Sequence, residues 1–345
     1  MTVISHHEGL FTSLAYLFED RLGGALYYPL GMPWYEQGFW NVYDHIETAI
    51  QYLSLDQLYK PKDGTPPLNQ IVEKDNGIYV VQDTNVKREI KGISLERFKQ
   101  EKFDIIIASI PQHVEPFIKL RNLYQPQAKL IFQVGNMWAF DTSFPIKNIL
   151  ASATIPSLPG FNTVQYHQEF SLDVFHYAPV TNRRKIYSFI NCLNVVDIYR
   201  KDWNLFLQLE KLMPDYEFRS YGAQARDGWC NGVEEVAQKT REATFVYHCK
   251  NQGDGFSYGM FTAAACGRPL ITRLSDYKGK LAEPLINDQT SIIVDGMIPQ
   301  QIADRIKEVD EKCIYMGEYI HNKFKETVSF DQEERAIRLF LDNLQ

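Results

Sequence analysis

The sequence lacks paired cysteines and an excess of basic residues. Its five cysteines are scattered and none forms a C-x-x-C pair, which argues against a zinc ribbon or a redox motif. We expect reduced, mostly buried thiols, as in a reducing compartment. Acidic residues outnumber basic ones, 43 to 36, and the formal net charge is -7. This balance argues against a broad basic surface for nucleic acid, although a local basic groove stays possible.

Signals for export, for membranes and for metal binding are also missing. His6, His7 and Glu8 interrupt the first apolar run, so we expect no signal peptide. No apolar stretch is long enough to cross a bilayer, which predicts no membrane span. No convincing loop carries an Asp-x-Asp motif, so no metal site and no cofactor are predicted. These absences indicate a cytoplasmic enzyme or binding protein.

What the sequence does contain is an alternation of strands and helices in both halves. The runs at 103–110 and 128–134 are continuously apolar, which is typical of parallel strands covered on both faces, and 111–126 is suited to a crossover helix. From 150 to 179 prolines and short apolar pieces suggest a connector. A second alternation fills 185–295, and three helices are expected after it. At 345 residues, the chain is predicted to be an α/β protein with two doubly wound Rossmann-like domains.

The stretch GDGFSYGMFTAAACGRPLI, residues 253–271, follows an apolar strand and is unusually rich in glycine and alanine. We expect a helix to begin near Phe256 or Ser257, where its free N–H groups and its dipole would attract an anion. Gly253, Gly255 and Gly259 would let the backbone approach a phosphate closely. A tight structural turn followed by a small-residue packing face explains the same composition about equally well.

The order of these residues also carries a resemblance. The chain reads Asp254-Gly255-Phe256-Ser257 and then 262–271 as TAAACGRPLI. It resembles the two-domain glycosyltransferases of the GT-B fold, in particular the large group with a C-terminal Glu-Gly-Phe-Gly, then Glu-Ala-x-Ala-x-Gly-x-Pro signature. The resemblance covers about 185–343, and in the N-terminal half only the order of elements agrees. It implies a GT-B-like fold with two Rossmann-like domains that face each other across a cleft.

The resemblance implies a domain for each substrate. Residues 1–165 would form the acceptor-binding domain, 166–184 a linker, 185–326 the nucleotide-sugar-binding domain, and 327–345 a helix that could pack back on the N-terminal domain. The family's two glutamates correspond to Asp254, placed against the donor sugar, and Thr262, placed against the ribose hydroxyls. Thr262 keeps a hydroxyl but lacks the two acceptor oxygens of a carboxylate. Retaining and inverting outcomes are therefore both open.

Further donor-site positions follow from the same resemblance. The family usually directs an arginine and a lysine at the donor diphosphate, and Arg200 and Lys201 stand at that place, with Lys201 nearer to the family's lysine. A solvated pair on the first turn of a helix is the alternative. Lys250 could add charge, and Arg268 is expected at the surface. The full set of expected donor contacts is Asn191, Arg200, Lys201, Lys250, Gly253, Gly255, Phe256, Ser257, Tyr258 and Thr262.

The acceptor is expected at loops of the N-terminal half. His7 or Glu8 could deprotonate an acceptor hydroxyl if the reaction inverts configuration, and in a retaining reaction the loop would only position the substrate. A metal bound by this loop, or one partly buried histidine without function, is the alternative. The other expected acceptor contacts are His6, Gly9, Asn136 and Trp138, of which Trp138 could equally be a core residue.

The leading hypothesis is a metal-independent glycosyltransferase that uses a nucleotide sugar, such as a UDP-sugar. Its acceptor could be a carbohydrate, a small molecule, a protein or a modified DNA base, as in viral DNA-modifying transferases. A nucleotide-sugar epimerase and a non-catalytic protein that binds nucleotides or glycans are the alternatives.

Overall fold

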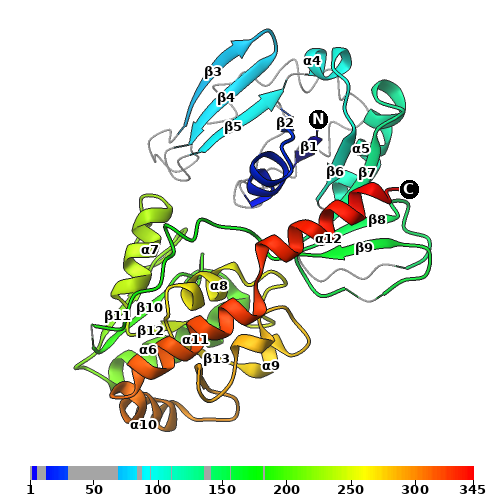
Figure 1. The fold of residues 1–345 in the computed structure, drawn as a ribbon. Helices are drawn as coiled ribbons and strands as arrows, with labels where there is room; N and C mark the ends of the chain where they lie inside the picture. The colour runs from blue at the N-terminus through cyan, green and yellow to red at the C-terminus, as the bar shows by residue number, and fades with distance from the viewer. Residues whose placement is uncertain are drawn as a thin grey trace. The chain divides into compact units, whose positions relative to one another are not determined.

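A computed structural model of the 345-residue chain describes residues 2–5, 13–29, 69–83, 88–93, 95–109, 111–135, 141–155, 157–181 and 183–345. The chain divides into two compact units. The first comprises Met1–Glu169 and Phe330–Gln345, and the second comprises Phe170–Ser329. The two units are coloured along the chain in Figure 1 and are described separately below.

The described part of the first unit contains a nine-stranded sheet with the order β3-β4-β5-β2-β1-β6-β7-β8-β9. The pairings from β5 to β9 are parallel, whereas β3, β4 and β5 pair antiparallel. The strands are β1 (Thr2–Ser5), β2 (Leu26–Pro29), β3 (Asn69–Asp75), β4 (Ile78–Asp83), β5 (Arg88–Ile93), β6 (Ile105–Ala108), β7 (Lys129–Val134), β8 (Asn148–Ala151) and β9 (Asn162–Gln165).

Helices cover this sheet because they carry apolar residues at helical spacing. Helix α5 (Pro111–Tyr124) connects β6 to β7, and α4 (Leu95–Gln100) follows β5. The C-terminal helix α12 (Phe330–Asp342) returns to this unit and runs beside β9 (Figure 1). Its Ile337 and Phe340 are buried in one cluster with Leu14, Phe18 and Leu150. The last helix is thus part of the core of the first unit.

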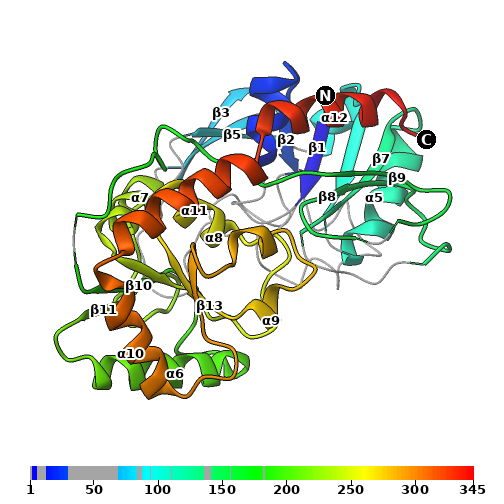
Figure 2. The ribbon, with the colours of Figure 1, turned by 60° about the horizontal axis from the view of Figure 1, so that its bottom comes forward.

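The second unit holds a five-stranded parallel sheet with the order β11-β10-β12-β13-β14. Its strands are β10 (Lys185–Ser188), β11 (Glu217–Ser220), β12 (Phe245–Tyr247), β13 (Leu270–Thr272) and β14 (Ser291–Ile293). The helices of this unit are α6 (Arg200–Leu212), α7 (Val233–Glu242), α8 (Tyr258–Ala265), α9 (Leu274–Tyr277), α10 (Pro299–Asp310) and α11 (Cys313–Thr327). Helix α11 lies alongside α8, and α10 alongside α6 (Figure 2).

The structure confirms the α/β class and the strand–helix–strand order that the sequence predicts in both halves. The connector expected between 150 and 179 is wrong in part, because β8 ends inside that range and β9 lies entirely within it. Strand β9 is four residues long and buries none of its side chains fully, so it lacks the apolar run that marks β6 and β7 in the same sheet. The predicted division of substrates between the domains stays a prediction.

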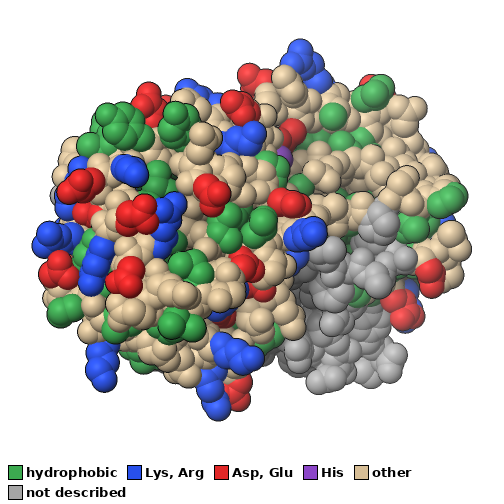
Figure 3. Space-filling model, turned by 90° about the horizontal axis from the view of Figure 1, so that it is seen from below, with side chains coloured by type: hydrophobic (Ala, Val, Ile, Leu, Met, Phe, Trp, Pro, Cys, Tyr) green, Lys and Arg blue, Asp and Glu red, His purple; other side chains and the backbone are tan. Residues whose placement is uncertain are grey.

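The state of the cysteines and the distribution of charged side chains agree with what the composition predicts. All five cysteines are free thiols, and Cys249, Cys266 and Cys313 are buried. Among the described residues on the face drawn in Figure 3, Lys and Arg side chains are interspersed with Asp and Glu and do not gather into one basic patch. Within the described ranges, no helix combines the length and hydrophobicity needed to cross a bilayer.

Candidate functional site

Two loops meet at the carboxyl edge of the second sheet. Strand β10 lies between β11 and β12, so the chain reverses its direction of winding beside β10, which is where open α/β sheets bind ligands. The loop after β10 contacts the loop after β12 at this point. Asn251 donates a hydrogen bond from Nδ2 to the carbonyl of Ile198 at 3.3 Å, and Lys250 Nζ lies 5.8 Å from the centre of the Tyr199 ring. This edge is the candidate site.

The turn that leads into α8 has an unusual backbone. Gln252, Gly253 and Ser257 have φ values of 66°, 58° and 49°, in the left-handed region that L-residues rarely adopt. A Cβ at Gly253 would lie 2.4 Å from the carbonyl oxygen of Asp276, so only glycine can occupy that position without moving the loop. Left-handed residues that are not glycine store strain, and such strain is common at functional sites.

The N-terminus of α8 is not capped by a side chain. Ser257 is the N-cap residue, but its hydroxyl donates to the carbonyl of Asp254 at 3.1 Å instead of accepting from the first turn. Within this turn, the N–H of Met260 already donates to the carbonyl of Ser257 at 2.9 Å. The dipole of the helix favours an anion at this end. Helix α8 begins at Tyr258, so the predicted start at 256–257 is confirmed to within two residues.

A mostly buried ion pair lies in the same turn. Lys250 Nζ donates to Asp254 Oδ2 at 2.8 Å, and the side chains are only 21% and 12% exposed. Burial alone would raise the pKa of Asp254, but the charge and the hydrogen bond of Lys250 lower it below its usual value. Burial likewise would lower the pKa of Lys250, and Asp254 raises it. Both groups are therefore charged at neutral pH.

Four buried polar atoms near this pair have no hydrogen-bond partner among the described residues. They are Nδ1 and Nε2 of His248, Oδ1 of Asp254 and the hydroxyl oxygen of Tyr277. The ring centres of His248 and Tyr277 lie 6.1 Å apart. Burial lowers the pKa of His248 to about 4, so its imidazole is neutral at physiological pH. Most buried polar groups in proteins are paired, so a cluster of unpaired ones beside an open helix end points to a ligand.

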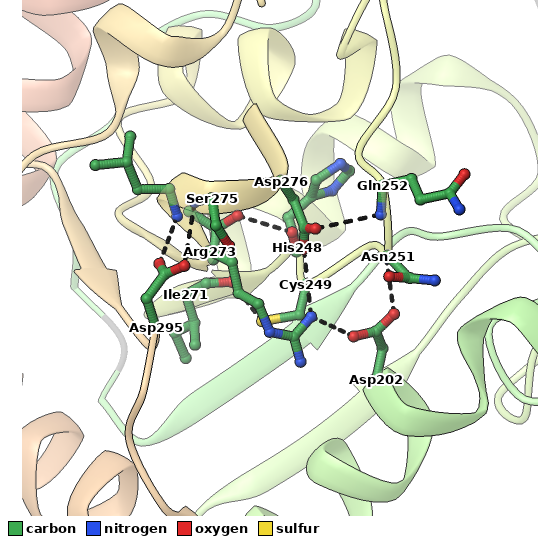
Figure 4. Close-up of polar contacts among 12 residues, drawn as sticks. Asp202, His248, Cys249, Asn251, Gln252, Ile271, Arg273, Ser275, Asp276 and Asp295 are labelled. Atoms are coloured by element: carbon green, nitrogen blue, oxygen red, sulfur yellow. Dashed lines mark hydrogen bonds and ion pairs between the residues drawn. The ribbon is translucent and has the colours of Figure 1, made fainter. Parts of the chain in front are cut away.

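Carboxylates from neighbouring elements hold the loop after β12 in place (Figure 4). Asp202 of α6 is fully buried, forms an ion pair with Arg273 after β13, and accepts from the N–H of Asn251 at 2.8 Å. Burial raises the pKa of Asp202, while Arg273 opposes this. Asp276 accepts from the N–H of Gln252 at 3.2 Å. These contacts hold the backbone of the loop at Asn251 and Gln252.

The residues predicted after β10 lie at the same edge but are more exposed. Asn191 is exposed, and its side-chain oxygen accepts from the N–H of Ala223 at 2.9 Å. Arg200 is 71% exposed and pairs with Asp197. Lys201 is exposed on the first turn of α6. Their expected contacts with a diphosphate stay predictions.

The predicted residues of α8 differ in how they are oriented. Gly255 and Ser257 are buried, and Phe256 is partly buried. The ring of Tyr258 packs edge-on against Phe170, with the ring centres 5.6 Å apart. Thr262 is 4% exposed, and its hydroxyl donates to the carbonyl of Tyr258 at 3.0 Å. The helix backbone thus takes up the one proton that the Thr262 hydroxyl can donate.

The expected acceptor contacts lie outside the described residues. These are His6, His7, Glu8, Gly9, Asn136 and Trp138. Strand β1, which precedes the first four of them, ends at Ser5, and β7, which precedes the last two, ends at Val134. Their roles stay predictions.

Arg268 is not at the surface, so the sequence-based expectation for it is wrong. Its side chain is fully buried and donates to the carbonyls of Ala178, Arg241, Cys266 and Gly267 at distances between 2.7 and 3.0 Å. Cys266 and Gly267 end α8, and Arg241 lies in the last turn of α7. Carbonyls at helix C-termini favour a cation, which explains why a buried guanidinium is stable here.

The sequence reasoning missed His248 and Tyr277. The pattern TFVYHC predicts a strand, and His248 is the first residue after β12, so its position at the carboxyl edge of the sheet could have been inferred. Tyr277 ends the short helix α9, which the sequence did not predict. Within the described ranges, no three His, Cys, Asp or Glu side chains are placed to hold a metal ion.

Comparison with known proteins supports the fold by structure and not by sequence. No model of a known protein family matches the chain, and no curated protein matches it in sequence. Solved structures match it over almost its whole length. HepE from Anabaena, solved with UDP and glucose, has a TM-score of 0.63 and 11% sequence identity, with 99% of each chain covered.

Two further structures extend the comparison. A glycosyltransferase from Rickettsia africae has a TM-score of 0.60 and 12% identity, covering 99% of this chain and 98% of its own. Sucrose-phosphate synthase from Thermosynechococcus elongatus has a TM-score of 0.57 and 10% identity, with 99% and 98% covered. With two Rossmann-like units and a match along its whole length, the chain has the GT-B fold of these glycosyltransferases.

Proposed function

We propose that the protein is a glycosyltransferase that takes a sugar from a UDP-sugar and transfers it to an acceptor hydroxyl. The observation that carries this proposal is the N-terminus of α8, which has no side-chain cap and lies beside the Lys250–Asp254 ion pair and the unpaired polar atoms of His248, Asp254 and Tyr277. Two of the structural neighbours support the choice of nucleotide. HepE was solved with UDP-glucose, and TarM from S. aureus was solved with UDP.

In this proposal the donor diphosphate binds at the first turn of α8. The N–H groups of that turn and the ammonium of Lys250 stabilise the negative charge that grows on the departing diphosphate as the glycosidic bond breaks. Lys201, on the first turn of α6, adds a second cation. These charges would make a divalent ion unnecessary, so we propose that transfer is metal-independent.

Asp254 is proposed to contact the donor sugar. Its Oδ1 is buried and unpaired, and can accept a hydrogen bond from a sugar hydroxyl. Thr262 is proposed to contribute little to ribose recognition, because its hydroxyl proton is used within α8. The ribose would then depend on backbone groups of the loop after β12.

We propose that the acceptor binds to the first unit. We also propose that the protein acts in the cytoplasm. His7 or Glu8 would deprotonate the acceptor hydroxyl if configuration is inverted, and Asn136 and Trp138 would contact the acceptor. The chemistry of these side chains suits a hydroxyl acceptor of a carbohydrate or small molecule. A protein or a modified DNA base is a less specific choice for an acidic chain.

The test is a titration of the protein with UDP, GDP and ADP in buffer containing EDTA, followed by NMR of each UDP-sugar after incubation with the protein alone. The proposal predicts that UDP binds without a divalent ion, and that one UDP-sugar slowly yields free sugar and UDP. An isomerised UDP-sugar would instead indicate an epimerase. Failure of all three nucleotides to bind would exclude a nucleotide-sugar enzyme.

One observation favours a second candidate, a protein that binds a nucleotide sugar without transferring it. The two family glutamates are replaced by Asp254 and Thr262, and Thr262 is buried with its hydroxyl bound to its own helix. The same NMR experiment separates the candidates, because a catalytically inactive protein binds UDP but releases no sugar.

A further inference from the structure

His248 is a buried polar residue that the proposed reaction does not yet use. It follows β12 directly and is 4% exposed. Its ring lies against the first turn of α8, because a Cβ built on Gly259 would be 3.2 Å from its Cε1. A larger residue at 259 would therefore press on the imidazole, and the Gly259–His248 contact brings the helix end and the ring into direct proximity.

In the part of the chain that the structure describes, no group forms a hydrogen bond with the ring nitrogens of His248. Both Nδ1 and Nε2 are buried. An apolar side chain of similar size would fill the same space without the desolvation cost of two unpaired nitrogens. The strands of a parallel sheet that is covered on both faces are mostly apolar. Packing alone therefore does not explain a histidine directly after β12.

The surrounding groups complement one another as donors and acceptors. Asp254 Oδ1 is an acceptor without a partner, the Tyr277 hydroxyl is a donor without one, and a neutral imidazole carries one N–H and one acceptor nitrogen. Tyr277 is adjacent to this turn, since its Cε1 would be 3.2 Å from a Cβ at Gly253. In the structure, Asp254 relies on Lys250 for its charge partner.

A donor phosphate bound at the N-terminus of α8 would compete with Asp254 for Lys250. Lys250 would then lie near two anions, Asp254 and the donor diphosphate, and the diphosphate carries the larger negative charge. A carboxylate as buried as Asp254 needs replacement hydrogen bonds when its cation moves away. Of the donors next to the turn, the Ser257 hydroxyl already donates to the Asp254 carbonyl and the Lys280 ammonium to the Gln252 carbonyl. The imidazole N–H of His248 and the hydroxyl of Tyr277 have no partner among the described residues and can supply these hydrogen bonds.

We propose that His248 is a positioning residue for Asp254: when the donor phosphate draws Lys250 away, the His248 imidazole and the Tyr277 hydroxyl bind Asp254 Oδ1 and hold the carboxylate toward the sugar. This inference rests on the proposed function. It separates two tasks within one site, since Lys250 and the α8 amides bind the diphosphate while His248 and Tyr277 orient the group that contacts the sugar.

The test compares His248→Leu with the wild type in three measurements: the melting temperature, the dissociation constant for UDP, and kcat for hydrolysis or transfer from the UDP-sugar that the wild type uses. We expect the melting temperature to stay equal or to rise, because two unpaired buried nitrogens are removed. The affinity for UDP should change less than about threefold, while kcat falls at least about tenfold. A purely structural histidine would produce the opposite pattern, a lower melting temperature with kcat unchanged.

Two further variants keep the outcome decisive. Tyr277→Phe removes a single atom, so the protein should fold, and we expect a smaller loss in kcat with unchanged UDP affinity. Thr272→Val is the matched control, because the Thr272 hydroxyl donates to the carbonyl of His248 at 2.9 Å and is not one of the unpaired polar groups. It should lower the melting temperature and leave kcat intact.

The results distinguish this inference from the proposed function. If wild-type protein binds no nucleotide and cleaves no UDP-sugar, the proposed function fails and the role of His248 fails with it. If the wild type is active and both His248→Leu and Tyr277→Phe retain its kcat, only the positioning role is overturned.

Discussion

The ammonium of Lys250 lies 2.8 Å from the carboxylate of Asp254, four residues further along the chain at the start of α8. Both groups are mostly buried, and each shifts the pKa of the other toward the charged form. The cation expected to bind a donor diphosphate is therefore neutralised, before a ligand arrives, by the carboxylate expected to contact the donor sugar. Binding and catalysis should respond differently when either partner is removed.

The turn at Gly253 should tolerate no side chain. Alanine at 253 would meet the carbonyl oxygen of Asp276 at 2.4 Å, whereas alanine at Gly279 would meet no atom within 4 Å. Both glycines have positive φ, so each substitution should cost about 1–2 kcal/mol in unfolding free energy, and Gly253→Ala should cost more than Gly279→Ala because of the contact with Asp276. We expect only Gly253→Ala to weaken UDP binding as well, by about tenfold, because it displaces the loop that leads into α8. Equal UDP affinities for the two variants, measured by calorimetry, would show that the turn does not shape the site.

The two cations on α6 should contribute unequally to donor binding. Arg200 already pairs with Asp197, whereas Lys201 has no ion pair among the described contacts. We expect Lys201→Ala to weaken UDP binding about three- to tenfold and Arg200→Ala to change it less than twofold, as is usual for exposed charges. Measurements at two salt concentrations provide the check, since the Lys201 effect should shrink at high salt. A larger effect from Arg200 would contradict this assignment.

Acid should destabilise the wild type more than the His248→Leu variant. Burial lowers the pKa of His248 in the folded state from 6.5 to about 4, so the unfolded chain binds a proton more readily than the folded one between these values. The folded protein therefore keeps its full stability above pH 6.5 and loses stability as the pH falls toward 4, because the buried ring resists the proton that the unfolded chain binds. Relative to the Leu variant, the wild type should lose about 3 kcal/mol between pH 7 and pH 4.

The groups that face His248 explain the direction of this shift. Asp254 favours the protonated ring and Lys250 disfavours it, but burial is the largest effect. Urea titrations of both proteins at several pH values measure the difference. Parallel stability curves for wild type and variant would mean that the imidazole is solvated or paired in the folded protein.

Arg268 should be needed for stability and not for binding. Replacing it with Met would remove the donors to the carbonyls of Ala178, in the segment before β10, and of Arg241, in the last turn of α7. We expect Arg268→Met to lower the unfolding free energy by about 3–5 kcal/mol. Arg305→Met, which breaks an exposed pair with Glu308 on α10, should cost less than about 1 kcal/mol and serves as the control. Similar stabilities for the two variants would contradict the structural role of Arg268.

The sequence predicts the five strands and most of the helices described in the second unit, because short strand segments alternate with helical patterns and the turns between them carry glycine and proline. It does not predict the short helix α9. The strands at 185–188 and 245–247 and the helix at 258–265 lie where the pattern places them. It predicts less of the first unit. The short β9 is half exposed and has no apolar run, so it cannot be distinguished from a connector by composition.

The sequence also predicts the α8 turn and the residues Lys250 and Asp254, which follow from the order of glycines and from a resemblance. It could not predict which buried groups lack partners. Arg268 looks like a surface residue in a run of small residues, and only the folded chain brings four carbonyls to its guanidinium. In the same way, the sequence shows only that His248 follows a strand. The structure shows that Gly259, in the first turn of α8, lies against its ring.

The most direct test of the central claim is one titration series with UDP, in EDTA, on the wild type, Lys250→Met and Asp254→Asn. The account predicts that Lys250→Met binds UDP at least about tenfold more weakly, through the loss of a charge-assisted hydrogen bond. Asp254→Asn should bind UDP as tightly as the wild type or more tightly, because Lys250 is released to the phosphate, while turnover of the donor falls. UDP affinity that is equal in all three proteins, or that is lost in Asp254→Asn and retained in Lys250→Met, would contradict a diphosphate site at the N-terminus of α8.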